Sequence, residues 1–143
     1  MMENIYELIP HRGPMLLLGS VVDVGEKSSS SEINISRDSS FYIEGKGVPS
    51  WIGVEYMGQT AALIAGYQLK QGAVTPHLGL LLGTRKYEAF TAWFKEGDEL
   101  HVSCQEVAVV GEQLATFLCE IRDKKDRALL ATAKLSVFRK PIA

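Results

Sequence analysis

Two residues in this sequence have the chemistry of an acid–base site, Glu55 and His11. Glu55 lies early in residues 51–71, an apolar stretch with almost no other charge. A carboxylate buried without partners is costly, so such a group is usually paired, protonated or functional. The sequence therefore favours a functional Glu55 over a structural carboxylate. His11 lies in the turn of residues 10–14, and an imidazole suits a general base, although composition alone favours a surface histidine there.

Three further positions have side chains or amides that could support such a site. Gln59 follows Glu55 by one helical turn on the same face, so we expect it to orient Glu55 by a hydrogen bond; a polar residue at an interface is the alternative. Gly53 lies at the expected helix start, where free backbone amides can hold an oxygen that gains negative charge. Arg85, beside Lys86, is a candidate for an exposed patch near a tunnel mouth, with ordinary solvated charge as the alternative.

Composition excludes several classes of protein and site. The 143 residues carry 15 Lys and Arg against 17 Asp and Glu, a net charge of −2, whereas nucleic-acid binding usually needs a basic face. We expect Cys104 and Cys119 to be reduced, buried residues rather than a disulfide. Neither the cysteines nor the three scattered histidines have the spacing of a metal site. The first residues lack a secretory pattern, so we expect a cytoplasmic protein.

The stretch 51–71 predicts one long helix, with Ser50 as its N-cap and Gly72 as its C-cap. It is apolar almost all the way round, which indicates burial on all sides or a membrane span. A helix of this size is about 30 Å long, enough to cross a bilayer. We expect no membrane span, because four polar or charged residues break the apolar run: Glu55, Gln59, Gln68 and Lys70.

The remaining pattern predicts an α+β fold in a single domain, residues 1–143. A short helix over 3–9 and strands over 15–24 and 31–36 precede the long helix, and four strands follow it, over 78–90, 99–109, 113–122 and 127–138. Short polar turns between strands predict an antiparallel sheet. An antiparallel sheet wrapped around one long apolar helix is the hotdog arrangement. One sheet cannot cover such a helix on every side, so we expect a second subunit against it.

Several motifs resemble one enzyme family. Residues 9–18 (IPHRGPMLLL) resemble the opening of bacterial 3-hydroxyacyl-[acyl-carrier-protein] dehydratases, which are hotdog enzymes, and residues 54–59 (VEYMGQ) are similar to their acidic helix motif. Residues 48–59 (VPSWIGVEYMGQ) and 80–87 (LLLGTRKY) resemble more closely the ApeP-type branch, encoded with aryl polyene biosynthesis. The resemblance covers essentially the whole chain.

The resemblance implies dehydration of a 3-hydroxyacyl thioester to the trans-2-enoyl thioester. On that reading His11 is the base, Glu55 is the acid, Gln59 orients Glu55, and amides near Gly53 polarise the carbonyl. The acid has to be protonated at neutral pH, which burial among apolar residues favours. The implied partner is an acyl carrier protein, which Arg85 would help to receive, and no metal or organic cofactor is needed. A homodimer, or pairing with a second hotdog subunit, is expected, and His11 and Glu55 can then come from different chains.

One departure from the family keeps other functions open. The fatty acid enzymes carry their catalytic histidine in a G-H-F-P-G loop ahead of the helix, and the corresponding residues 42–49 here (YIEGKGVP) contain no histidine. His11 is the best substitute, because it belongs to a matched motif. The alternatives are a hotdog thioesterase, in which a helix carboxylate acts without a histidine, and a non-catalytic hotdog partner subunit.

Overall fold

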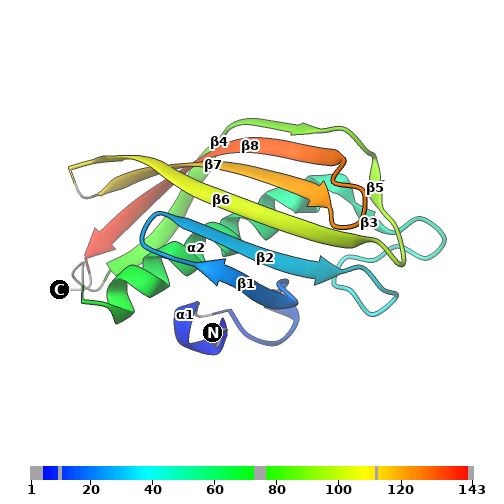
Figure 1. Ribbon diagram of the computed structural model, residues 1–143, viewed down its shortest axis with the longest axis horizontal. Coiled ribbons are helices and arrows are strands. Elements are labelled where there is room, and N and C mark those ends of the chain that lie inside the picture. Colours follow the sequence, from blue (N-terminus) through cyan, green and yellow to red (C-terminus); the bar gives the residue numbers. More distant parts are fainter. Residues whose placement is uncertain (1–4, 10, 73–76, 112, 142–143) are drawn as a thin grey trace.

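A six-stranded antiparallel sheet wraps around one long helix in the computed structural model, which describes residues 5–9, 11–72, 77–111 and 113–141 (Figure 1). This is the hotdog arrangement that the sequence predicts. The elements in chain order are α1 (Ile5–Leu8), η1 (Gly13–Met15), β1 (Ser20–Val24), β2 (Ser28–Asn34), β3 (Val48–Pro49), η2 (Ser50–Ile52), α2 (Gly53–Lys70), β4 (His77–Ala89), β5 (Trp93–Phe94), β6 (Glu99–Val110), β7 (Leu114–Asp123) and β8 (Leu129–Pro141).

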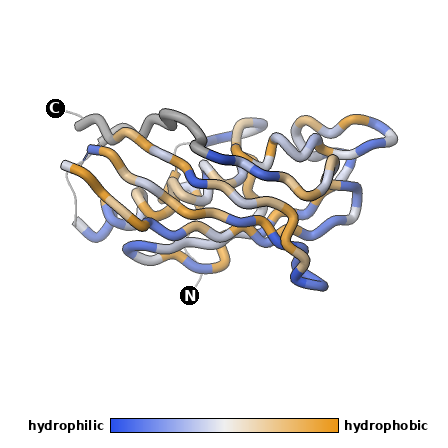
Figure 2. The backbone as a smooth tube through the Cα atoms, turned by 90° about the horizontal axis from the view of Figure 1, so that it is seen from above, coloured by the Kyte–Doolittle hydropathy of each residue, from blue (hydrophilic) through white to orange (hydrophobic). Residues whose placement is uncertain are grey.

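The large sheet has the strand order β1-β2-β6-β7-β8-β4, so β1 and β4 are its edges. Alternate residues along β2, β6 and β7 are buried, because successive side chains point to opposite faces of a sheet. The buried set faces α2 and forms the core together with Phe94, Tyr56 and Met57. Seen from above, hydrophobic stretches run along the strands and hydrophilic ones gather at the turns (Figure 2).

Helix α2 begins differently from the prediction. Residues 50–52 form a 3-10 turn, Ile52 takes the N-cap position, and no side chain caps the helix. Ser50 is therefore not the N-cap; its carbonyl accepts a 2.5 Å hydrogen bond from the hydroxyl of Tyr87 instead. At the other end Gly72 has φ 73°, a left-handed conformation that suits glycine after a helix, as predicted.

The single chain leaves one face of α2 uncovered, as expected for one sheet against an apolar helix. One face packs on the sheet and is buried, whereas Glu55 and Leu69 on the other side are exposed. Polar side chains hold the buried face: the Ser29 hydroxyl donates to the Thr60 carbonyl over 2.6 Å, and the hydroxyls of Ser31 and Thr60 lie 2.8 Å apart. Within the described residues, no helix is long and apolar enough to cross a membrane.

The strand expected over 15–24 is shorter than predicted. Residues 13–15 form the 3-10 turn η1, and regular pairing with β2 begins only at Ser20. The short ladder of β3 with β5 was not predicted, since two-residue strands have no periodic pattern.

Cys104 and Cys119 are free and buried, as predicted. They lie directly opposite each other on β6 and β7. Burial, and then the hydrogen-bond interaction of the Cys104 thiol with the neighbouring Cys119, raise the pKa of Cys104. Both residues therefore behave as small core residues.

Candidate functional site

The turn that carries His11 is held by its neighbour, Arg12. One guanidinium nitrogen of Arg12 donates to the carbonyl oxygens of Ile9 and His11, both over 2.8 Å. The other terminal nitrogen donates to the carbonyl of Tyr6 over 2.8 Å, and the guanidinium lies 4.8 Å from the centre of the Tyr6 ring. A planar cation with five donors suits this task, because it ties several carbonyls at once. Arg12 therefore gives the His11 turn a defined conformation.

His11 is partly buried and lies close to Glu55. Burial lowers the pKa of His11; the nearby Glu55 carboxylate opposes this, and the Arg12 cation adds to it. Within the described part of the chain, its Nδ1 is buried and has no hydrogen-bond partner. A neutral imidazole with an unoccupied ring nitrogen can accept a proton. One chain thus brings the two predicted ionisable residues together, whereas we expected that they could come from different subunits.

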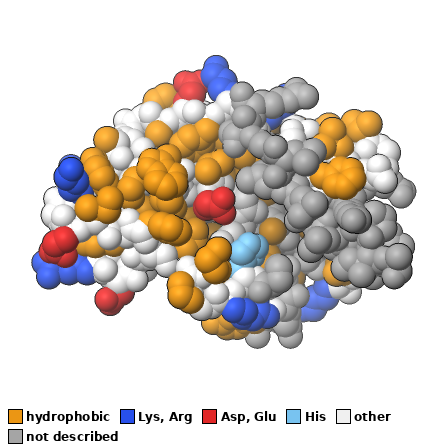
Figure 3. Space-filling model, turned by 180° about the vertical axis from the view of Figure 1, so that it is seen from behind, with side chains coloured by type: hydrophobic (Ala, Val, Ile, Leu, Met, Phe, Trp, Pro, Cys, Tyr) orange, Lys and Arg blue, Asp and Glu red, His pale blue; other side chains and the backbone are white. Residues whose placement is uncertain are grey.

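Glu55 differs from the expectation of a buried acid, because its side chain is exposed in the single chain. The face of α2 that carries it is the one that the sheet does not cover. Figure 3 shows a histidine and a single acidic side chain side by side on such a face, surrounded by hydrophobic side chains. Three large exposed hydrophobic residues lie near the site in sequence, and we call them the apolar rim: Met15, four residues after His11, Trp51, four residues before Glu55, and Phe41, next to the Ser40 that bonds the His11 turn.

Gln59 is buried and does not have the contacts predicted for it. Its Nε2 donates to the carbonyl of Met15 over 2.7 Å, and its Oε1 accepts from the amide of Leu17 over 2.9 Å. These bonds tie α2 to the segment after the His11 turn. The expected hydrogen bond that orients Glu55 is therefore replaced by a backbone clamp.

Packing, rather than the approach of a ligand, explains why residue 53 is a glycine. A Cβ at this position would overlap the hydroxyl of Tyr87 and lie 3.0 Å from the side chain of Ile121. The amide of Gly53 donates to the carbonyls of Ser50 and Trp51, so it is not a free donor for a substrate oxygen. The reason is the 3-10 turn ahead of α2, which uses the amide that a bare helix start would leave free. Burial raises the pKa of Tyr87 to about 12, so its hydroxyl stays protonated and donates.

The side chain of Arg85, on β4, lies outside the described residues. Its neighbour Lys86 is exposed and its ammonium lies 2.8 Å from a carboxylate oxygen of Glu88, which raises the pKa of Lys86. An exposed pair of this kind contributes little to stability. The patch expected here stays a prediction.

The loop that corresponds to the family's histidine loop lies beside the His11 turn. The hydroxyl of Ser40 donates to the carbonyl of Pro14 over 3.0 Å. Later in the loop, Ile43 and Gly47 form an isolated antiparallel bridge. Residues 42–49 contain no histidine, and the Ser40 contact places the segment just before them beside the turn that carries His11. Nothing in the sequence could have indicated the Ser40 contact, because its partner is a backbone atom 26 residues away.

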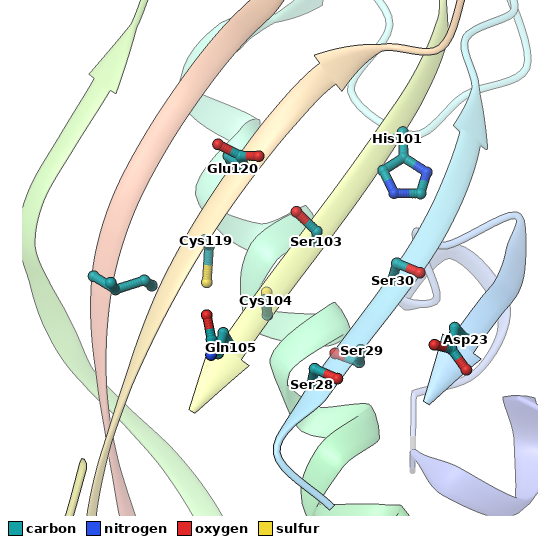
Figure 4. A pocket seen from close by; sticks show the side chains of 11 residues that line it. Asp23, Ser28, Ser29, Ser30, His101, Ser103, Cys104, Gln105, Cys119 and Glu120 are labelled. Atoms are coloured by element: carbon teal, nitrogen blue, oxygen red, sulfur yellow. The ribbon is translucent and has the colours of Figure 1, made fainter. Parts of the chain in front are cut away.

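A hollow on the sheet is a different site. It has a volume of about 510 Å³ and lies on the face of the sheet away from α2, lined by side chains of β1, β2, β6 and β7 (Figure 4). His101, Ser103 and Gln105 point into it from β6. The sheet separates this hollow from Glu55 and His11, so it takes no part in their chemistry. No group of three or more possible metal ligands occurs among the described residues.

Comparisons with known proteins point to one family and one fold. A family model described as ApeP-like, ApeP dehydratase, matches residues 3–142. The chain is similar to a chain of the dehydratase heterocomplex ApeI:P from Xenorhabdus doucetiae, with a TM-score of 0.84 and 26% identity over 96% of this chain and 90% of that chain.

Two further solved structures are more distant. A hypothetical thioesterase with coenzyme A from Streptococcus pneumoniae has a TM-score of 0.67 and 12% identity, covering 85% of each chain. The PaaI protein of the Escherichia coli phenylacetic acid degradation operon has a TM-score of 0.64 and 13% identity, over 83% of this chain and 81% of that one. These likenesses show the hotdog fold alone. No curated protein matches the chain.

Proposed function

Because the chain belongs to the ApeP-like dehydratase family, we propose that it dehydrates a 3-hydroxyacyl thioester carried on an acyl carrier protein. The product is the trans-2-enoyl thioester. The imidazole of His11 takes the proton from the carbon next to the thioester carbonyl. Glu55 gives a proton to the hydroxyl group, which leaves as water. One proton is removed and one is supplied, so the reaction needs no cofactor.

The observation that carries this proposal is the proximity of His11 and Glu55 at the start of α2. The lowered pKa of His11, caused mainly by burial, supports the role of base, because the imidazole is then neutral at pH 7. Its buried Nδ1 has no hydrogen-bond partner among the described residues, so no contact there holds the ring in the protonated form.

The role of Glu55 as an acid requires a second subunit. The proposed acid has to carry a proton, which removal of its carboxyl group from water favours, and a single chain leaves Glu55 exposed. We propose that another hotdog subunit, a second copy or a related chain, covers Glu55 and the apolar rim. The similarity to a chain of a dehydratase heterocomplex supports such pairing. The edge position of β4, next to β8 at the end of the sheet, supports a contact between sheets.

Thioester hydrolysis is the second candidate, and the exposure of Glu55 favours it. An ionised carboxylate beside a thioester carbonyl can activate water or attack directly. The fold also occurs in thioesterases, as the distant structural similarities indicate. Hydrolysis would release free acid and free carrier rather than a dehydrated carrier.

The test supplies a 3-hydroxyacyl-carrier-protein and follows the carrier by mass spectrometry. Loss of one water from the acyl carrier supports dehydration, while free acid and free carrier support hydrolysis. The assay is run with the chain alone and with a second hotdog subunit added. Turnover only in the mixture would assign this chain to a paired enzyme. His11→Ala and Glu55→Gln are the site variants, and full turnover by both would refute the assigned residues.

A further inference from the structure

Gln59 is the side chain that links the two proposed reacting residues. It lies on α2 one turn after Glu55, and its amide binds the backbone on both sides of Leu16. Only 3% of Gln59 is exposed, so these bonds are shielded from water. The side-chain amide of Gln59 takes the place of a neighbouring strand, because it offers one donor and one acceptor to the backbone of residues 15–17.

The segment that Gln59 holds is continuous with the His11 turn. Residues 13–15 form η1, whose amides bond back to the carbonyls of Arg12 and Gly13. Arg12 in turn holds the carbonyls of Ile9 and His11. The turn is therefore held at two points. Arg12 binds the carbonyls of Ile9 and His11, and Gln59 binds the segment that follows the turn. Within the described residues, the side chain of Gln59 supplies hydrogen bonds between this segment and the helix that carries Glu55.

We propose that Gln59 is a positioning residue that sets the place of His11 relative to Glu55. The expected effect on catalysis rests on the proposed function, whereas the expected effect on the position of His11 does not. Because Glu55 and Gln59 share one rigid helix, a clamp at Gln59 fixes the His11 turn at a set offset from Glu55. A shift of about 1 Å in a reacting group can lower a rate by about a hundredfold.

A matched control exists on the same helix. Gln68 is also buried, at 7% exposed, and its Nε2 donates to the carbonyl of Glu26 over 2.5 Å. Glu26 lies in the turn between β1 and β2, away from His11 in the sequence. Gln68→Leu therefore removes a buried side-chain clamp of α2 without touching the His11 turn.

The experiment compares Gln59→Leu, Gln59→Glu and Gln68→Leu in the full chain. The first readout is the NMR titration of His11, assigned with His11→Ala. Release of the turn exposes His11 to water, so in Gln59→Leu its titration midpoint should rise towards the ordinary value near 6.5. In Gln68→Leu it should stay where it is in the wild type.

The second readout is turnover in the mass assay, with the second subunit where it is needed. Gln59→Leu should lower kcat at least tenfold with a smaller change in KM, and Gln68→Leu should change kcat less than threefold. In Gln59→Glu burial favours the protonated carboxyl, which can bond both Leu17 and Met15 but loses its donor when it ionises. The kcat of this variant should therefore lie between those of the other two and fall further as the pH rises. If Gln59→Leu does not fold, Gln59→Glu carries the same comparison.

An unchanged His11 titration in folded Gln59→Leu, or an equal change in Gln68→Leu, overturns the inference. If the wild type dehydrates no substrate, the proposed function fails, and the titration still decides whether Gln59 positions His11.

Discussion

Replacing Gly66 or Gly58 of α2 by alanine should change the stability of the protein in opposite directions. A Cβ at Gly66 would overlap the carbonyl oxygen of Leu8 and lie 2.7 Å from its carbonyl carbon, whereas ordinary contact begins at 3.4 Å. These are backbone atoms, so α1 has to move away from α2. A Cβ at Gly58 would meet nothing within 4 Å. The two substitutions are thus chemically identical and differ only in what each methyl group meets.

The magnitude follows from what α1 buries. Leu8 and Ile9 are 5% and 3% exposed, and full burial of such a side chain stabilises by about 1.5–3 kcal/mol. Loss of half that burial for both costs about 1.5–3 kcal/mol. Alanine gains about 0.5–1 kcal/mol over glycine inside a helix. Gly66→Ala should therefore lose about 1–2 kcal/mol of the free energy of unfolding, and Gly58→Ala should gain about 0.5–1 kcal/mol.

Urea unfolding followed by circular dichroism measures both changes as shifts in the transition midpoint at unchanged slope. Light scattering on the same samples checks that the assembly state is the same. Because α1 leads directly into the His11 turn, Gly66→Ala should also move the His11 titration, and Gly58→Ala should not. Equal destabilisation by both variants, or a stable Gly66→Ala, would refute the packing argument.

Four further predictions concern the side chains of His11, Tyr87 and the two cysteines. The kcat/KM of the wild type should rise with pH to a plateau, with a midpoint below the ordinary histidine value of about 6.5, because burial lowers the pKa of His11; a midpoint above 6.5 would contradict this. The folded state then takes up its proton later than the unfolded chain as pH falls, so this group's contribution to stability is lost below about pH 6.5, and His11→Ala should flatten that loss in urea unfolding. Tyr87→Phe removes the donor to the Ser50 carbonyl and should cost about 1–2 kcal/mol of stability by the same measurement; no change would mean that the bond is not formed. Cys104 and Cys119 should resist a thiol reagent in the native protein and react twice after denaturation, and fast native labelling would show that they are accessible.

The strands after α2 were predictable because their side chains alternate. The expected strand 113–122 is observed as Leu114–Asp123, and 99–109 as Glu99–Val110. One buried face and one wet face impose a period of two, and polar turns mark the ends. The long helix was predictable from its length and its final glycine. Its start was not, since a 3-10 turn before it leaves no capping signature.

The site was predictable in its residues but not in its contacts. Residues 15–19 are apolar and resemble a strand, yet Gln59 pairs with Met15 and Leu17 in place of a neighbouring strand. No periodic pattern reports a side chain that binds backbone over 40 residues away. The exposure of Glu55 was missed for a related reason. An apolar helix face has the same sequence whether its own sheet or another subunit covers it.

The two proposed reacting groups therefore differ in what a single chain provides. For His11 one chain supplies the burial, the neighbouring carboxylate and a turn held by Arg12 and Gln59. For Glu55 it supplies the position, and the described residues leave its side chain exposed to water. A base is ready at neutral pH when its proton affinity is low, whereas an acid has to hold its proton, which requires desolvation. A single chain therefore provides the base in a suitable environment but leaves the acid in water. We expect this of an enzyme whose active site is completed only when a second subunit binds.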